Sequence, residues 1–317
     1  MVPKGYNTLR ALIETRYGIL SQLISNVEKH YHSPWIDFQN YVIKTAKENC
    51  DGDNEIYFSI LHSFDTEEEI LESLLKETRR ILFCSIFSYY ENMLNEILSY
   101  YGIATKAQQV KQVFEVIKNE YKNRYSEELI ADAASDFYRL LRNYFMHGKL
   151  SSYKDYVKLH SFVGATDGIK LYGNMSIDIT DNSFLLKSLN DLRRILVDIE
   201  ESFTLKITEE WMTLKRVKEY ISEIIKLYPP EYPGLEDEYP PYCSIKVHKL
   251  ILEAEKECLP IAKRGNAEAQ LLLSRLYLNL YEIPNKKRGL IWLRKSASQG
   301  QKDAIEILSE LSNDKTI

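Results

Sequence analysis

Proline placement is the feature of this sequence that most constrains its fold. Five of the nine prolines lie between positions 229 and 242, in a segment that also carries four acidic residues and no basic one. A helix cannot continue through such a cluster, because proline lacks a backbone N–H and its ring clashes with the preceding turn. The segment predicts a linker over residues 229–244 between a large N-terminal part and a small C-terminal part.

The N-terminal part shows the apolar spacing of helices. Thr66 and Glu69 form a capping-box pattern ahead of a periodic apolar run that ends before Gly102, which predicts one long helix over residues 66–101. Other helices are expected over residues 7–29, 35–48, 106–121 and 126–146, and from residue 182 toward residue 228 with a break near residues 204–208. Residues 168–180 alternate apolar and polar side chains around Gly173 and Asn174, which predicts one β-hairpin.

Part of the long helix carries no charge on any face. Residues 81–90 read ILFCSIFSYY. A helix of this kind is buried on all sides or is covered by another subunit.

The C-terminal part contains an internal repeat. Residues 261–274 align with residues 296–309, and the matched pairs are Ala262 with Ala297, Gly265 with Gly300, Ala269 with Ala304, Leu273 with Leu308 and Ser274 with Ser309. A period of this length with small residues at fixed places is typical of stacked helical hairpins. Together with Leu276-Tyr277 and Trp292 to Lys295, the segment resembles Sel-one-like repeats, which are relatives of the tetratricopeptide repeat. The resemblance covers about residues 246–312 and implies that residues 245–317 serve as an adaptor that binds a protein partner, or as a folding cap, and carry no chemistry.

These patterns predict an all-α fold in four parts. They are an N-terminal helical extension over residues 1–60, a helical domain with a small β-hairpin over residues 61–228, the linker over residues 229–244, and a short α-solenoid of about two repeats over residues 245–317.

Composition narrows the classes of function. A net charge of −5 and a pI near 5.8 argue against a protein that coats nucleic acid through bulk charge, so any RNA must meet a local site. The sequence has no apolar run long enough for a membrane span and no leader pattern, so a cytoplasmic protein without membrane contact is expected. Cys50, Cys84, Cys243 and Cys258 lack paired spacing, and neither a disulfide framework nor a metal site is expected.

The predicted helix over residues 126–146 ends in a polar stripe. Its apolar face comprises Ile130, Ala133, Ala134, Phe137, Leu141 and Tyr144 or Phe145. The other side places Arg139, Asn143 and His147 at intervals of four, with Arg142 beside Asn143. In one interpretation, His147 suits the negative end of the helix dipole, Gly148 caps the helix, and the arginines are solvated.

A second interpretation rests on a resemblance. Arg142-Asn143, three further residues and His147, followed by Gly148, resemble the Arg-(Asn/Asp/His)-x(3 to 5)-His signature of HEPN domains. Glu91, within Tyr89 to Asn92, resembles the acidic position that many such domains carry on the preceding long helix. The resemblance covers approximately residues 60–205. It implies a HEPN-like helical bundle that cleaves RNA without metal or cofactor at the interface of a symmetric homodimer.

The residue types fit this chemistry. His147 would act as general acid or base, and Arg142 would hold the phosphate and stabilise its developing charge. Asn143 would orient His147 or bond the ribose, and Glu91 would hold Arg142 or His147 in place. The expected function is an RNA endonuclease of the toxin-like or antiviral defence type. The alternatives are a catalytically inactive HEPN dimer that serves as a scaffold through its repeats, and a purely structural helical adaptor.

Overall fold

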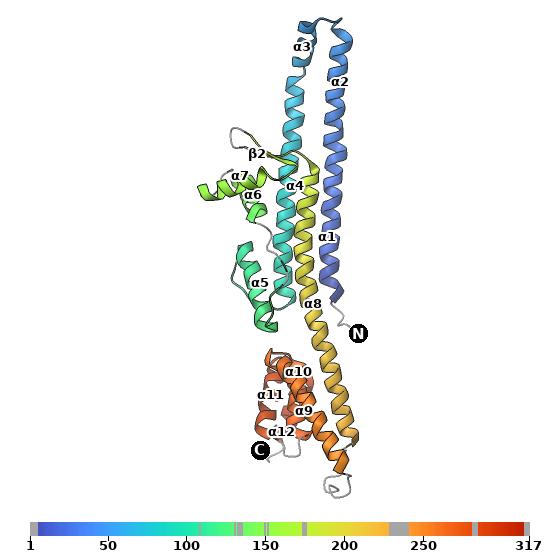
Figure 1. The fold of residues 1–317 in the computed structure, drawn as a ribbon, viewed down its shortest axis with the longest axis vertical. Helices are drawn as coiled ribbons and strands as arrows, with labels where there is room; N and C mark the ends of the chain where they lie inside the picture. Colours follow the sequence, from blue (N-terminus) through green and yellow to red (C-terminus); the bar gives the residue numbers. More distant parts are fainter. Residues whose placement is uncertain are drawn as a thin grey trace. The chain divides into compact units, whose positions relative to one another are not determined.

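The computed structural model describes residues 6–107, 109–129, 131, 136–148, 150, 152–172, 176–227, 241–280 and 285–313. This described part is helical apart from one two-stranded antiparallel sheet (Figure 1). The predicted all-α class with a small hairpin is therefore confirmed. Contacts divide the chain into two compact units, Met1–Ser202 and Phe203–Ile317.

The first unit begins with a long helical run of three segments. These are α1 (Tyr6–Val27), the π-helical turn η1 (Glu28–His32) and α2 (Ser33–Asn49). The predicted gap between residues 29 and 35 is wrong. Pro34 is the second residue of α2 and follows the wider π-helical turn η1, in which the Ser33 N–H bonds the Glu28 carbonyl, and the helical run continues through it.

The N-terminal helix belongs to the core of the first unit. The Tyr89 hydroxyl donates to the Ile13 carbonyl at 3.2 Å, and Arg16 Nη1 donates to Met93 Sδ at 3.6 Å. Leu9, Ile13 and Ile24 are buried along α1. The helix α1 is thus not part of a separate extension, because it packs on the helix that carries Tyr89 and Met93.

That partner is α4 (Asp65–Tyr100), which follows α3 (Asn54–His62). The capping box predicted from Thr66 and Glu69 is wrong, since α4 begins one residue earlier and Phe64 at its start makes no side-chain cap. Acidic side chains in the first turn, Asp65 among them, complement the helix dipole instead. At the other end the chain turns at Gly102, whose φ of +62° favours glycine.

The uncharged run of α4 is buried on one side only. Phe83, Ile86, Phe87 and Tyr90 are buried, whereas Ile81 is 63% exposed and Ser85 and Ser88 are exposed. Burial on all sides within one chain is therefore wrong. The other alternative, in which a second subunit covers the exposed side of this run, stays a prediction.

Two shorter helices follow, α5 (Val110–Tyr125) and α6 (Asp136–His147). The helix expected to begin at residue 126 starts later, because Ser126 adopts a left-handed φ of +58° and its N–H bonds the Lys122 carbonyl at the end of α5. Phe137 and Leu141 of α6 are buried as predicted. The predicted core positions Ile130, Ala133 and Ala134 lie outside the described residues.

A helix that the sequence reading missed, α7 (Tyr153–Val163), precedes the hairpin. The hairpin pairs β1 (Ile169–Leu171) with β2 (Ile177–Ile179), and Ile169 lies opposite Ile179. The predicted hairpin is thus confirmed, while its expected turn at Gly173 and Asn174 lies outside the described residues.

The helix α8 (Asn182–Leu227) runs from the first unit into the second without the predicted break near residues 204–208. Thr208 is accommodated because its hydroxyl donates to the Thr204 carbonyl within the helix at 2.8 Å. The second half of α8 shares one core with two later helices. The buried members of that core are Leu214, Val217, Ile221, Ala254, Cys258, Ile261, Ala262, Ala269, Leu272, Leu273, Leu276 and Tyr277.

The packing therefore divides the chain earlier than the predicted linker. The end of the expected linker at residues 241–244 is helical, because α9 (Pro241–Lys263) begins with Pro241 at its first position, where proline is tolerated. Residues 228–240 lie outside the described part of the chain.

The second unit otherwise consists of two successive helical hairpins. The first joins α9 to α10 (Ala267–Arg275) with the π-helical turn η3 (Leu276–Leu280), and the second joins α11 (Lys286–Ser298) to α12 (Lys302–Asn313). The matched residues Gly265 and Gly300 both have positive φ, +99° and +81°, between the helices of their hairpins. The matched Ala269 and Ala304 are both fully buried.

The hairpins approach closely at Gly289. A Cβ there would lie 2.5 Å from Leu278 Cγ, so only glycine fits between α11 and η3. Across the described ranges, no helix has the length and apolar character needed to cross a membrane.

Candidate functional site

The end of α6 carries the predicted site residues. Phe137 and Leu141 bury one side of the helix, whereas Asn143 is half-buried and His147 is exposed at its end. The helix closes at Gly148, where φ is +65° and the N–H bonds the Tyr144 carbonyl at 2.8 Å. The predicted Gly148 cap is therefore present, directly after the motif of Arg142, Asn143 and His147.

Arg142 pairs with Glu91 across two helices. Its Nη2 lies 3.7 Å from Glu91 Oε2, and each side chain is little more than a quarter exposed. Burial raises the pKa of the Glu91 carboxyl above its ordinary value, and the charge of Arg142 opposes that shift. Of the two partners considered for Glu91, the structure thus brings Arg142 to it.

Asn143 also contacts Arg142. The Nη1 of Arg142 donates to Asn143 Oδ1 at 3.2 Å. Asn143 was considered as a residue that orients His147, but its oxygen is engaged with the guanidinium in this structure. The amide and the carboxylate together fix the position of the Arg142 head group.

His147 is exposed at the last position of α6. In the part of the chain that the structure describes, no side chain forms a hydrogen bond or ion pair with its ring. An accessible imidazole can exchange protons with a bound molecule near neutral pH. The histidine is thus presented to solvent within two turns of a held guanidinium.

Arg139, the first member of the polar stripe, is engaged elsewhere. Its Nε lies 3.5 Å from Asp136 Oδ1, and Lys158 Nζ of α7 lies 3.2 Å from Asp136 Oδ2. Burial would raise the pKa of Asp136, but the Lys158 hydrogen bond and the neighbouring cations outweigh it and lower that pKa. Arg139 therefore belongs to a surface ion-pair group and not to the Arg142 cluster.

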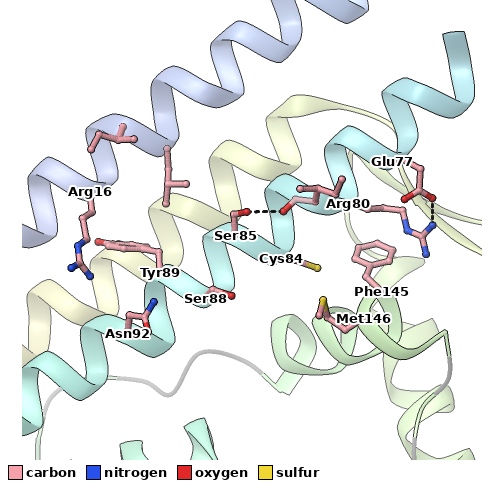
Figure 2. A pocket seen from close by; sticks show the side chains of 13 residues that line it. Arg16, Glu77, Arg80, Cys84, Ser85, Ser88, Tyr89, Asn92, Phe145 and Met146 are labelled. Carbon is pink, nitrogen blue, oxygen red and sulfur yellow. Dashed lines mark hydrogen bonds and ion pairs between the residues drawn. The ribbon is translucent and has the colours of Figure 1, made fainter.

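An open groove of about 730 Å³ lies next to this cluster (Figure 2). Its lining comes from α1, α4 and α6 and consists of Arg16, Ile19, Leu20, Glu77, Arg80, Ile81, Cys84, Ser85, Ser88, Tyr89, Asn92, Phe145 and Met146. Burial raises the pKa of the Cys84 thiol, and the charges of Arg142 and Arg80 oppose that shift. The positive charge of Arg142 therefore acts on Cys84 in the groove wall.

Arg80 closes one end of the groove. Its guanidinium lies over the Phe145 ring at 5.2 Å and pairs with Glu77 (Figure 2). Sequence reasoning did not single out Arg80 or Cys84. The available signal was helical spacing, since positions 80, 84 and 88 follow one face of α4 that leads to Glu91.

Two further residue groups near the cluster do not extend it. The tyrosines Tyr89 and Tyr90 of α4 are buried in the core, as aromatic residues at helical spacing usually are. Within the described residues, no three His, Cys, Asp or Glu side chains lie together as a metal-binding group.

The arrangement combines a held guanidinium, an exposed imidazole and a neighbouring open groove. Such a set can bind a phosphate and exchange a proton with a group next to it. No family model, curated protein or solved structure matches this chain.

Proposed function

We propose that this chain is a metal-independent RNA endonuclease whose site is the end of α6. The observation that carries the proposal is the Arg142 cluster, in which Glu91 and Asn143 hold the guanidinium at 3.7 and 3.2 Å, while His147 on the same helix is exposed. These are the residue types of the HEPN-like motif.

Each residue has a distinct role in this proposal. Arg142 binds the scissile phosphate and stabilises the negative charge that develops on its oxygens. His147 takes the 2′-hydroxyl proton or protonates the leaving 5′-oxygen. Glu91 and Asn143 are positioning residues, because they contact Arg142 and limit the orientations of its guanidinium.

The proposed active unit is a homodimer. The stripe presents one histidine, whereas cleavage needs both an acid and a base. An isologous pairing supplies the second histidine from the partner. The groove face supports such a pairing, because Ile19, Ile81 and Met146 are 58%, 63% and 55% exposed around a wall free of charge at Cys84, Ser85 and Ser88.

The proposed reaction uses the RNA as its own nucleophile. The 2′-oxygen attacks the adjacent phosphorus, the 5′-oxygen leaves with a proton, and the products carry a 2′,3′-cyclic phosphate and a 5′-hydroxyl. DNA lacks the nucleophile and should not be cut.

The test is incubation of the purified chain with total RNA in EDTA, followed by mapping of the new ends. Cyclic phosphate ends that disappear in the His147→Ala variant support the proposal. Cleavage that stops in EDTA, or that acts equally on DNA, would refute it.

The second candidate is a catalytically inactive dimer that serves as a scaffold and recruits a protein through its repeats. One observation favours it: Arg142 is already engaged by Glu91 and Asn143, and no described side chain orients His147. Expression in a host cell separates the two candidates. A toxin-like or antiviral defence nuclease slows growth and loses this effect on His147→Ala substitution, whereas a scaffold does neither.

A further inference from the structure

The exposed face of α11 is strongly basic. Lys286, Lys287, Arg288, Arg294 and Lys295 are all exposed, and the helix contains no acidic residue. The opposite face is buried through Gly289, Leu293 and Ser296, which fixes the cations toward solvent. The charge of the patch is therefore presented by a packed helix.

This charge is not neutralised within the described part of the chain. None of the five cations forms an ion pair with a described acid, whereas Arg275 nearby in sequence pairs with Asp303 at 3.2 Å. Two of the five contact aromatic rings: Lys295 lies 4.7 Å from the centre of the Trp292 ring, and Arg288 lies 6.0 Å from that of Tyr277. Neither contact removes the positive charge.

The position of the charges opposes helix stability. Three cations occupy the start of α11, where the helix dipole is already positive and acidic residues are favoured. Placing Lys286, Lys287 and Arg288 there weakens the helix and concentrates positive potential at one end. A bound anion at this end of the helix would offset the repulsion.

We propose that this face of α11 binds the phosphate backbone of RNA. Lys287 and Arg294 are seven residues apart, as are Arg288 and Lys295, so the helix carries two parallel rows with cations about 10.5 Å apart along its axis. A polyanion that follows the helix contacts both members of a row. Phosphate binding of this kind needs exposed Lys and Arg and no apolar pocket.

The same face is poorly suited to an acidic protein. Protein interfaces depend on buried aromatic or aliphatic anchors, and the only large apolar side chain exposed by α11 in the described residues is Ile291. The face also supplies the local basic site that a chain of net charge −5 needs to hold RNA. The choice of RNA rests on the proposed function, whereas binding of a polynucleotide does not require cleavage.

The test measures binding with a probe that cannot be cleaved. A fluorescent 2′-O-methyl oligouridine lacks the free 2′-hydroxyl, so its affinity for the full chain, followed by fluorescence anisotropy against salt concentration, is independent of nuclease activity. The test variant is Lys287→Gln with Arg294→Gln. The matched control is Lys249→Gln with Lys256→Gln, which removes two exposed lysines at the same spacing from α9.

The test variant should lower the slope of log K against log salt by about 1.4, since each single-strand phosphate contact contributes about 0.7. At about 0.1 M salt this corresponds to roughly 25-fold weaker binding, while the control keeps the wild-type slope. The thermal midpoint of the test variant should stay level or rise, because a cation leaves the positive end of α11. This readout excludes loss of binding through unfolding.

Three outcomes overturn the proposal. They are an unchanged slope in the test variant, an equal loss in the control, and binding of polyglutamate as tight as that of the oligonucleotide, which would assign the face to an acidic protein. If the probe binds as expected but total RNA is never cut, the proposed nuclease fails and this binding face stands.

Discussion

Arg79 of α4 donates through Nε to Asn182 Oδ1 at the start of α8, at 3.0 Å, and both side chains are buried. Arg79 Nη1 also donates to the Thr180 carbonyl at 2.8 Å, and Asn182 Nδ2 donates to Glu28 Oε2 at 2.6 Å. Burial lowers the pKa of Arg79, while Glu28 and Asp181 oppose that shift. This network of hydrogen bonds therefore joins η1, α4, the start of α8 and the end of the hairpin.

Replacing Asn182 with Ala should destabilise the first unit. The substitution leaves the buried Nε of Arg79 without its acceptor, and an orphaned charged donor costs about 3 kcal/mol of unfolding free energy. Urea unfolding measures the change. The control Lys187→Ala alters an exposed side chain of the same helix and should cost less than about 0.5 kcal/mol. Equal losses would contradict the role given to the Arg79 group.

Arg142→Ala and His147→Ala should each lower RNA cleavage by roughly 100- to 10,000-fold, the range for loss of one charge-stabilising or acid/base group. Their double variant should lose less than the product of the two, because the residues act together. Single-turnover cleavage measures the rates, with His62→Ala as a control on the exposed surface of α3. Normal rates in either single variant would refute the catalytic assignment.

Glu91→Gln should change how stability depends on pH. Because the pKa of Glu91 is raised in the folded chain, the folded state binds more protons than the unfolded state as pH rises above the ordinary value of 4.5. The unfolding free energy of the wild type therefore falls with rising pH in that range, and the Glu91→Gln variant lacks this contribution. Urea unfolding at several pH values gives the comparison, and Glu96→Gln, an exposed site on the same helix, should follow the wild type.

Ile81→Glu should weaken the proposed homodimer. Ile81 is 63% exposed in one chain, so the substitution spares the fold, but pairing would bury an unpaired carboxylate. A penalty of roughly 3 kcal/mol raises the dimer dissociation constant by about 100-fold. Sedimentation analysis measures the dissociation constant. The control is Leu252→Glu, which introduces the same charge at an exposed leucine of α9. A variant that remains dimeric would move the interface away from the groove.

A fragment of residues 203–317 should show a cooperative thermal transition, whereas residues 241–317 should lose it. Leu214, Val217 and Ile221 of α8 complete the core of α9 and α10, and the shorter fragment removes them. Circular dichroism during heating compares the two. A cooperative transition in the shorter fragment would restore the boundary suggested by the prolines.

Patterns within short stretches of the sequence predicted the elements whose structure depends on those stretches alone. Alternation gave the hairpin that pairs Ile169 with Ile179, and the repeated Gly265 and Gly300 marked equivalent turns. The pairing of Arg142 with Glu91 followed from a resemblance to a known motif. The end of α8 was assigned to the wrong unit, because its apolar positions do not reveal which helices cover them. The groove was missed for the same reason, since α1, α4 and α6 form it from distant parts of the chain.

The π-helical turn η1 determines which side of α2 faces the core of the first unit. A turn with i to i+5 hydrogen bonds holds more residues than an α-helical turn, so η1 sets the rotation between the side of α1 that buries Ile24 and the side of α2 that buries Val42 and Ala46. An α-helical turn of the same five residues in place of η1 would turn every following side chain of α2 by roughly 100° around the helix axis. Val42 and Ala46 would then face away from their present packing, which makes the length of this turn as constrained as its composition.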